Sequence, residues 1–296
     1  MPSHILAINP WIYDFAAYDM WARPLGLLYV AAALERAGAD VRLMDCLDRY
    51  HPDVPTRGKG KASEDAFGCG HFASTVLPKP DCLRPVPRRW RRYGIPLDSF
   101  RGALVDCPVP DVVLVTSMMT YWYPGVIECV RLVREQWPGV PVLLGGVYGT
   151  LCEAHARVQT GVDEVIPSGS LRDVVGRIVQ WCSLDERRLE WPTERPPHPA
   201  YHLWGERRAV AVLTGFGCPF RCTYCASHLL QPRMVRFPVD YVLEELAGHA
   251  RGGTRDVAFY DDALLVDFER HLGPILEGVV ARGLKLRLHT PNGIHP

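Results

Sequence analysis

Short apolar runs alternate with amphipathic segments along the first 180 residues, and this alternation limits the possible folds most strongly. The apolar runs are typical of strands buried on both faces, and the intervening segments have the spacing of helices. Strands and helices that alternate in this way form a parallel sheet with helices over both faces. The expected strands are residues 3–9, 40–46, 111–117, 140–146 and 163–168, and the expected helices are 24–39, 124–139 and 171–182.

The alternation restarts after a segment rich in proline and charge, residues 184–200. Such a composition is typical of an interdomain linker. We therefore expect an α/β domain over residues 1–183, a linker over 184–208 and a second domain over 209–296. In the second domain the expected strands are 209–216, 256–262 and 284–291, and the expected helices are 238–253 and 267–283.

Residues 47–99 interrupt the first series with a long insertion rich in proline, glycine and charge. Loops of this length are usually functional or disordered. The insertion carries a basic run with interleaved Trp90 and Tyr93, and it contains the segment 67–72, which is either a second metal contact or a turn over a ligand. The basic residues are Arg84, Arg88, Arg89, Arg91 and Arg92. A solvated loop or a lid explains them better than binding of single-stranded nucleic acid or a phosphorylated substrate, because the charge of the whole chain is balanced.

Composition and charge give no support for several classes of partner. The chain has 33 basic and 33 acidic residues, so its net charge favours neither nucleic acid nor an acidic membrane surface. The N-terminus lacks the features of a signal peptide, and no apolar run has the length of a membrane span. We therefore expect a cytoplasmic protein, and in a reducing compartment clustered cysteines favour a metal site over disulfides.

Cys218, Cys222 and Cys225 lie within eight residues, directly after the first strand of the second series. Three thiolates at this spacing suit zinc or an iron–sulfur cluster. A zinc site would need a distant fourth ligand, such as Cys69, His71 or His228. Three unrelated buried thiols are the remaining alternative. An iron–sulfur cluster with three protein ligands leaves one iron open for a substrate or cofactor.

The segment "CPFRCTYC" resembles the C-x3-C-x2-C motif of the radical S-adenosylmethionine (SAM) superfamily, with Tyr224 as the aromatic residue before the last cysteine. The resemblance implies a 4Fe–4S cluster on Cys218, Cys222 and Cys225, with SAM chelating the fourth iron. It also implies that reductive cleavage of SAM yields a 5′-deoxyadenosyl radical, which abstracts hydrogen from a substrate. The cofactors carry that chemistry, and the protein positions them.

The same resemblance implies contacts to SAM. Tyr224 would lie near the adenine. Tyr260, Asp261 and Asp262 end the second strand, where the family holds the SAM amino group with a Gly-Gly-Glu-like segment. This sequence has no glycine pair there. Asp261 and Asp262 therefore also fit a solvated strand end or a helix N-cap.

A doubly wound domain before such a motif resembles the cobalamin-dependent branch of the superfamily, on the segments 22–46, 116–135 and 143–156. Ligands of doubly wound sheets bind at the carboxyl ends of the strands. The resemblance implies a cobalamin site there, although a buried strand end and a tight turn also explain these segments. No D-x-H-x-x-G motif supplies a histidine to cobalt. The candidate residues are Asn9, Ser117, Met118, Thr120, Gly145, Gly146, Tyr148 and Thr150.

The function expected from the resemblance is methyl transfer to an unactivated carbon by a cobalamin-dependent radical SAM enzyme. Ring rearrangement, a noncatalytic iron–sulfur or cofactor-binding protein, half of a split enzyme, and a first domain that binds substrate remain alternatives. The expected partners are a small-molecule or peptide substrate and an electron donor such as flavodoxin or ferredoxin. Because residues 209–296 supply only part of a barrel, we also expect a missing C-terminal part and no turnover by this chain alone.

Overall fold

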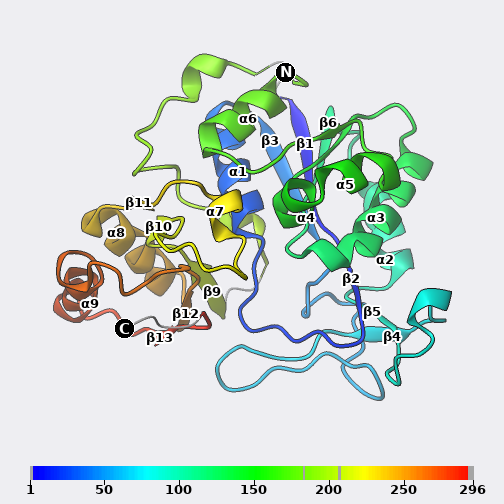
Figure 1. The fold of residues 1–296 in the computed structure, drawn as a ribbon, viewed down its shortest axis with the longest axis horizontal. Helices are drawn as coiled ribbons and strands as arrows, with labels where there is room; N and C mark the ends of the chain where they lie inside the picture. Colours follow the sequence, from blue (N-terminus) through cyan, green and yellow to red (C-terminus); the bar gives the residue numbers. More distant parts are fainter. Residues whose placement is uncertain (1–2, 183, 206–207, 293–296) are drawn as a thin grey trace.

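The computed structural model describes residues 3–182, 184–205 and 208–292. It contains two parallel sheets with different helices around them (Figure 1). The first sheet has five strands in the order β3-β1-β6-β7-β8, which is a doubly wound order. Its strands are β1 (His4–Asn9), β3 (Asp40–Asp45), β6 (Val112–Val115), β7 (Val142–Leu144) and β8 (Glu164–Val165).

Helices cover both faces of the first sheet, as the alternation predicts. Alternate residues of β1 point to opposite faces, so that Leu6 and Ile8 join one apolar core while Ile5 and Ala7 join the other. The first core is closed by α2 (Leu97–Asp106), α3 (Tyr123–Gln136), α4 (Gly146–Leu151) and α5 (Glu153–Gln159). The second core is closed by α1 (Leu25–Arg36) and α6 (Leu171–Val179).

Segment 184–205 lies against this second core. Leu189, Trp191 and Ala200 are buried with residues of α1 and α6. The segment contains two short helices, η3 (Glu186–Arg188) and η4 (Tyr201–Leu203). The proline-rich stretch is therefore anchored by apolar side chains.

The insertion forms a small sheet with β2 (Ile12–Asp14), which the sequence analysis did not predict. Strands β2, β5 (Arg91–Tyr93) and β4 (Ser74–Val76) are antiparallel in the order β2-β5-β4, and η1 (Asp81–Leu83) lies between β4 and β5. Trp90 and Tyr93 are buried, so these aromatic residues help to form the fold of the insertion.

The second sheet has three parallel strands in the order β13-β12-β9. They are β9 (Ala209–Val212), β12 (Asp256–Phe259) and β13 (Arg287–His289). Helices α8 (Val239–Arg251) and α9 (Leu272–Ala281) close one face around an apolar core. Strands β12 and β13 are shorter than the expected 256–262 and 284–291, and two other expected bounds differ more. The expected strand 209–216 ends at Val212, and the helix expected from residue 267 begins at Leu272, after η5 (Phe268–Arg270).

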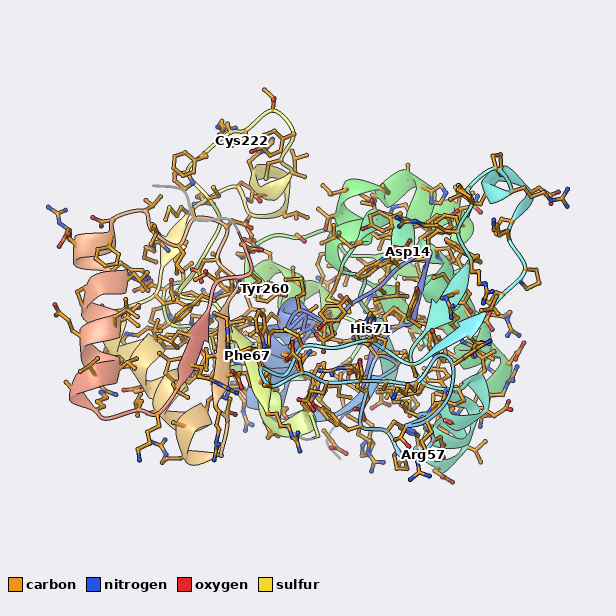
Figure 2. The ribbon with its side chains drawn as sticks, turned by 90° about the horizontal axis from the view of Figure 1, so that it is seen from below. Asp14, Arg57, Phe67, His71, Cys222 and Tyr260 are labelled. Carbon is orange, nitrogen blue, oxygen red and sulfur yellow. The ribbon has the colours of Figure 1, made fainter. Side chains whose placement is uncertain are left out.

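The other face of the second sheet is covered by the insertion and by the loop before α1. Trp21 and Cys69 pack on Ala209 and Ala258. The Trp21 ring also stacks on His289, with 4.2 Å between the ring centroids. In Figure 2, Phe67 and Tyr260 lie close to this sheet. The insertion thus joins the two sheets.

In the described part of the chain, no helix combines the length and the apolar character that a membrane crossing requires.

Candidate functional site

The cysteine loop starts from a hairpin at the carboxyl end of β9. Strand β10 (Gly215–Phe216) pairs antiparallel with β11 (Val235–Arg236), and the loop between them contains the short helix α7 (Ser227–Leu230). Gly217 has a positive φ of 75°, and a Cβ there would lie 2.5 Å from the carbonyl oxygen of Arg233. Only glycine fits this close approach without strain. The glycine before Cys218 therefore closes the base of the loop.

The three cysteines lie on this loop with free thiols. Cys222 is exposed and lies at the outer tip of the loop in Figure 2. Cys225 Sγ lies 3.1 Å from Ser227 Oγ and accepts a hydrogen bond from the Ser227 amide at 3.4 Å. Over residues 3–182, 184–205 and 208–292, no three Cys, His, Asp or Glu side chains are gathered as a metal site. Three accessible thiols on one loop are nevertheless a chemically suitable donor set for an iron–sulfur cluster.

The predicted SAM contacts are not grouped. The Tyr224 side chain is 91% exposed on the cysteine loop. Tyr260 lies apart from Cys222 in Figure 2, and its hydroxyl donates to the carbonyl oxygen of Met20 at 2.5 Å. Asp262 is exposed.

Asp261 is engaged in the base of the hairpin. Its carboxylate accepts hydrogen bonds from the Thr214 amide at 3.0 and 3.1 Å and from Thr214 Oγ1 at 2.7 Å. The Arg236 guanidinium lies 3.5 Å from the same carboxylate. Burial raises the pKa of Asp261 to about 6, while the hydrogen bonds from Thr214 oppose this rise. These contacts link the end of β12 to the loop between β9 and β10.

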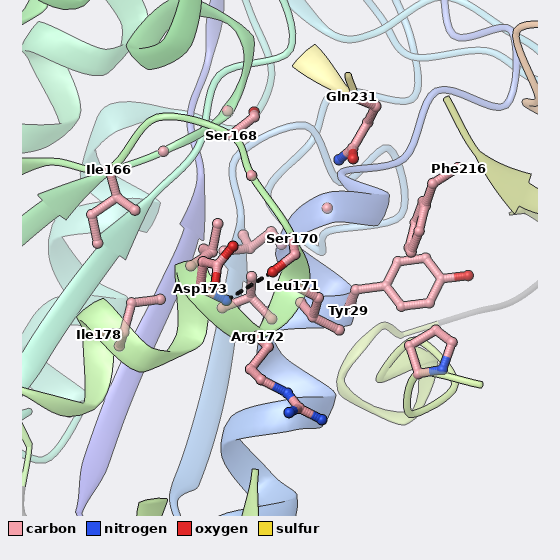
Figure 3. A pocket seen from close by; sticks show the side chains of 18 of the residues that line it. Tyr29, Ile166, Ser168, Ser170, Leu171, Arg172, Asp173, Ile178, Phe216 and Gln231 are labelled. Atoms are coloured by element: carbon pink, nitrogen blue, oxygen red, sulfur yellow. Dashed lines mark hydrogen bonds between the residues drawn. The ribbon is translucent and has the colours of Figure 1, made fainter. Parts of the chain in front are cut away.

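A cavity of about 860 Å³ lies at the carboxyl ends of β6 and β7 (Figure 3). Its volume is in the range of small-molecule and cofactor sites. The start of α1 and the loop from β8 into α6 form two walls, and the segment 191–196 adds to them. The hairpin β10–β11 closes another side with Phe216 and Val235. The structural element that carries the cysteines therefore also lines this cavity.

Glycines leave open space along the cavity wall. A Cβ on Gly26 or Gly169 would meet no atom within 4 Å, and one on Gly145 would meet only the carbonyl oxygen of Ile166 at 3.7 Å. The α-carbon of Gly146 instead faces the protein, because a Cβ there would lie 2.6 Å from the carbonyl oxygen of Ser117. The wall would thus allow a ligand to approach the backbone closely at several positions.

Of the eight residues predicted for cobalamin, Gly145 and Gly146 line the cavity. The other six are not among the residues that line it. Ser117 donates to the carbonyl oxygen of Met119, and Thr150 Oγ1 lies 2.8 Å from Oγ of the lining residue Ser168. The six residues are Asn9, Ser117, Met118, Thr120, Tyr148 and Thr150.

Asn9 and Tyr148, like Ser117, are buried and hydrogen-bonded within the first half of the chain. Asn9 donates to Asp45 Oδ1 at 2.7 Å. The Tyr148 hydroxyl lies 2.7 Å from His155 Nδ1. Met118 packs against the insertion sheet, beside Ile12 and Tyr93.

The sequence analysis missed most of the cavity wall. Ser168, Gly169 and Ser170 follow β8, so the rule that found Gly145 could have found them as well. Ser170 caps α6 by accepting a hydrogen bond from the Asp173 amide at 3.2 Å, as Figure 3 shows. Trp191 and Gln231 come from distant parts of the chain, and no local signal marked them.

Comparison with solved structures finds a similar arrangement in TsrM, a radical S-adenosylmethionine methyltransferase from Kitasatospora setae. One structure holds tryptophan substrate and the SAM analogue aza-SAM. It matches 96% of this chain and 53% of its own chain, with a TM-score of 0.60 and 17% identity. The fold is similar to that of TsrM.

A second TsrM structure holds cobalamin and a 4Fe–4S cluster. It matches 97% of this chain and 56% of its own, with a TM-score of 0.59 and 17% identity. This chain thus spans about half the length of the structures that it matches. No family model and no curated protein matches the sequence.

Proposed function

We propose that this chain belongs to a cobalamin-dependent radical SAM enzyme that transfers a methyl group to an unactivated carbon. One observation carries the proposal: the hairpin that presents Cys218, Cys222 and Cys225 also lines the cavity at the carboxyl ends of β6 and β7. The similarity of the fold to that of TsrM, which has been solved with a cluster, a SAM analogue and cobalamin, supports it.

In this proposal residues 1–183 bind cobalamin, residues 184–208 are a linker, and residues 209–296 hold the cluster on part of a radical SAM barrel. The separate five-stranded and three-stranded parallel sheets support the division. A soluble electron donor, such as flavodoxin or ferredoxin, would supply electrons. The methyl acceptor would be a small molecule or a peptide.

The chain's own residues would bind and orient the cofactors. The three cysteine thiolates would hold the cluster, and Tyr224 would contact the adenine of SAM. Gly26, Gly145 and Gly169 would admit the nucleotide arm of cobalamin to the cavity, because their Cα atoms leave space there. When bound, the cluster supplies the electron that cleaves SAM, and cobalamin carries the methyl group.

Visible spectra of the anaerobically reconstituted chain, recorded with and without added cobalamin, test this assignment. We expect the broad absorption of an iron–sulfur cluster, and a separate cobalamin spectrum without signs of a protein histidine on cobalt. Gly169→Leu should weaken cobalamin binding by filling the cavity. Gly139→Leu is the matched control, because Gly139 is exposed, lies outside the cavity and also has open space around it.

Electron paramagnetic resonance of the reduced protein then tests whether the cluster binds SAM. Addition of SAM should change the cluster signal, since SAM would coordinate the open iron. A cluster signal that does not change when SAM is added would contradict the proposal that this is a radical SAM enzyme. Cobalamin binding that is absent, or equal in Gly169→Leu and the unaltered chain, would contradict the proposed cavity. A cluster and SAM response without cobalamin binding would instead favour a first domain that binds substrate.

A further inference from the structure

A second recess, of about 500 Å³, lies on the insertion. The loop that follows β2 forms one side with Phe15 and Tyr18. Strand β5 contributes Arg91 and Tyr93, and the insertion loops add Lys61 and His71. None of its lining residues borders the large cavity at β6 and β7. The two sites are therefore separate.

Aromatic rings form much of the wall of this recess. Tyr93 and Phe72 are buried and give it an apolar floor. The Phe15 ring is held edge-on against Trp90, with 5.0 Å between centroids. Tyr18, which is 44% exposed, stands edge-on to His71 at 4.8 Å. These contacts fix the rings where a planar ligand could pack against them.

The residues that line the recess carry positive charge and no negative charge. Lys61 and Arg91 line it, and no Asp or Glu does. Arg91 donates to the neutral Ser74 Oγ at 3.2 Å. Among the residues that the structure describes, no carboxylate forms an ion pair with Lys61 or Arg91.

The acidic residue opposite Arg91, Asp14, is engaged elsewhere. It is the register partner of Arg91 on β2. Its Oδ2 accepts from Trp122 Nε1 at 3.0 Å, and its Oδ1 accepts from the Phe15 amide at 2.6 Å. The half-buried guanidinium of Arg91 therefore keeps donor capacity that its neighbours do not use.

We propose that this recess binds an aromatic carboxylate, with the acidic group on Arg91 and Lys61 and the ring against Tyr18 and the apolar floor. A guanidinium in a partly buried site binds carboxylates through paired, charge-assisted hydrogen bonds. This site is independent of the cluster and of cobalamin, so it gives a role to part of the basic run in the insertion.

Isothermal titration calorimetry of the full chain with 1-naphthoate tests the proposal, with uncharged 1-naphthalenemethanol as the comparison ligand. We expect saturable binding of 1-naphthoate that weakens about tenfold in Arg91→Gln and in Lys61→Gln, since each change removes one charge-assisted contact. Arg84→Gln is the matched control in the same insertion, because Arg84 is exposed and pairs with Asp81.

Arg91 lies on the central strand of a small sheet, so its replacement could also disturb the fold. Lys61 is exposed, and Lys61→Gln therefore tests the contact without this complication. The proposal is overturned if the chain does not bind 1-naphthoate at millimolar concentration, or if the uncharged ligand binds equally well. Unchanged affinity in Lys61→Gln and in a folded Arg91→Gln variant would also overturn it.

Discussion

Asp45 is a half-buried residue at the end of β3, and its carboxylate contacts the neighbouring strand β1. Its Oδ1 accepts hydrogen bonds from Asn9 at 2.7 Å and from the Leu47 amide at 3.0 Å, while its buried Oδ2 has no hydrogen-bond partner among the described residues. Burial raises the pKa of Asp45 to about 7, and the hydrogen bonds only partly offset this. The Asn9 side chain thus donates a hydrogen bond to Asp45. The position of Asn9 at a strand end had suggested a contact to a ligand.

The raised pKa makes stability depend on pH in a defined direction. Because the folded pKa exceeds the ordinary value, protonated Asp45 stabilises the fold fully below about pH 4, and this contribution is lost as the pH rises through about 7. Between about pH 4 and about pH 7, each pH unit lowers the free energy of unfolding by about 1.4 kcal/mol at most.

Asp45→Asn should remove this dependence. Urea unfolding at pH 5 and pH 8 should show the original chain losing stability relative to Asp45→Asn as the pH rises. Asp98→Asn, which replaces an exposed carboxylate and keeps Asp45, should lose stability with rising pH as the original chain does. A parallel pH response in the original chain and Asp45→Asn would contradict the predicted titration.

At the scale of elements, the conformation of the cysteine loop depends on the hairpin β10–β11. The sequence analysis expected one strand through residue 216, because the segment is mostly apolar. The strand breaks because Thr214 turns to bind Asp261 and because Gly215 and Gly217 bring the chain against residues 233–236. Such contacts join residues far apart in the sequence, so local periodicity cannot show them.

Gly217→Ala should disturb this loop selectively. The added methyl group meets the Arg233 carbonyl oxygen at a positive φ, which costs on the order of 1–3 kcal/mol locally. We expect lower iron incorporation with cobalamin binding retained. Gly102→Ala, on the exposed face of α2 with open space around it, should leave iron incorporation unchanged. Full iron incorporation by Gly217→Ala would show that the backbone conformation at residue 217 does not matter.

At the scale of the whole molecule, the sequence predicted the sheets better than the contacts between them. Ile5 to Ile8 lie in a short apolar run, which together with the helical segment that follows it is typical of a buried strand. The insertion sheet was missed because its strands are three residues long and pair at a distance, as Ile12 does with Tyr93. The cavity was found only in part, because its wall combines Gly26 with residues as distant as Val235. The three cysteines were identifiable because their signal is local.

Metal analysis after anaerobic reconstitution tests the central claim most directly, since the claim is that Cys218, Cys222 and Cys225 together hold one iron–sulfur cluster. The account predicts about four irons per chain, with absorption that fades on reduction by dithionite. Replacing any of the three by Ala should abolish iron binding, whereas Cys82→Ala or Cys182→Ala should preserve it. Stoichiometric zinc in place of iron, or full iron content after loss of one of the three cysteines, would contradict the account.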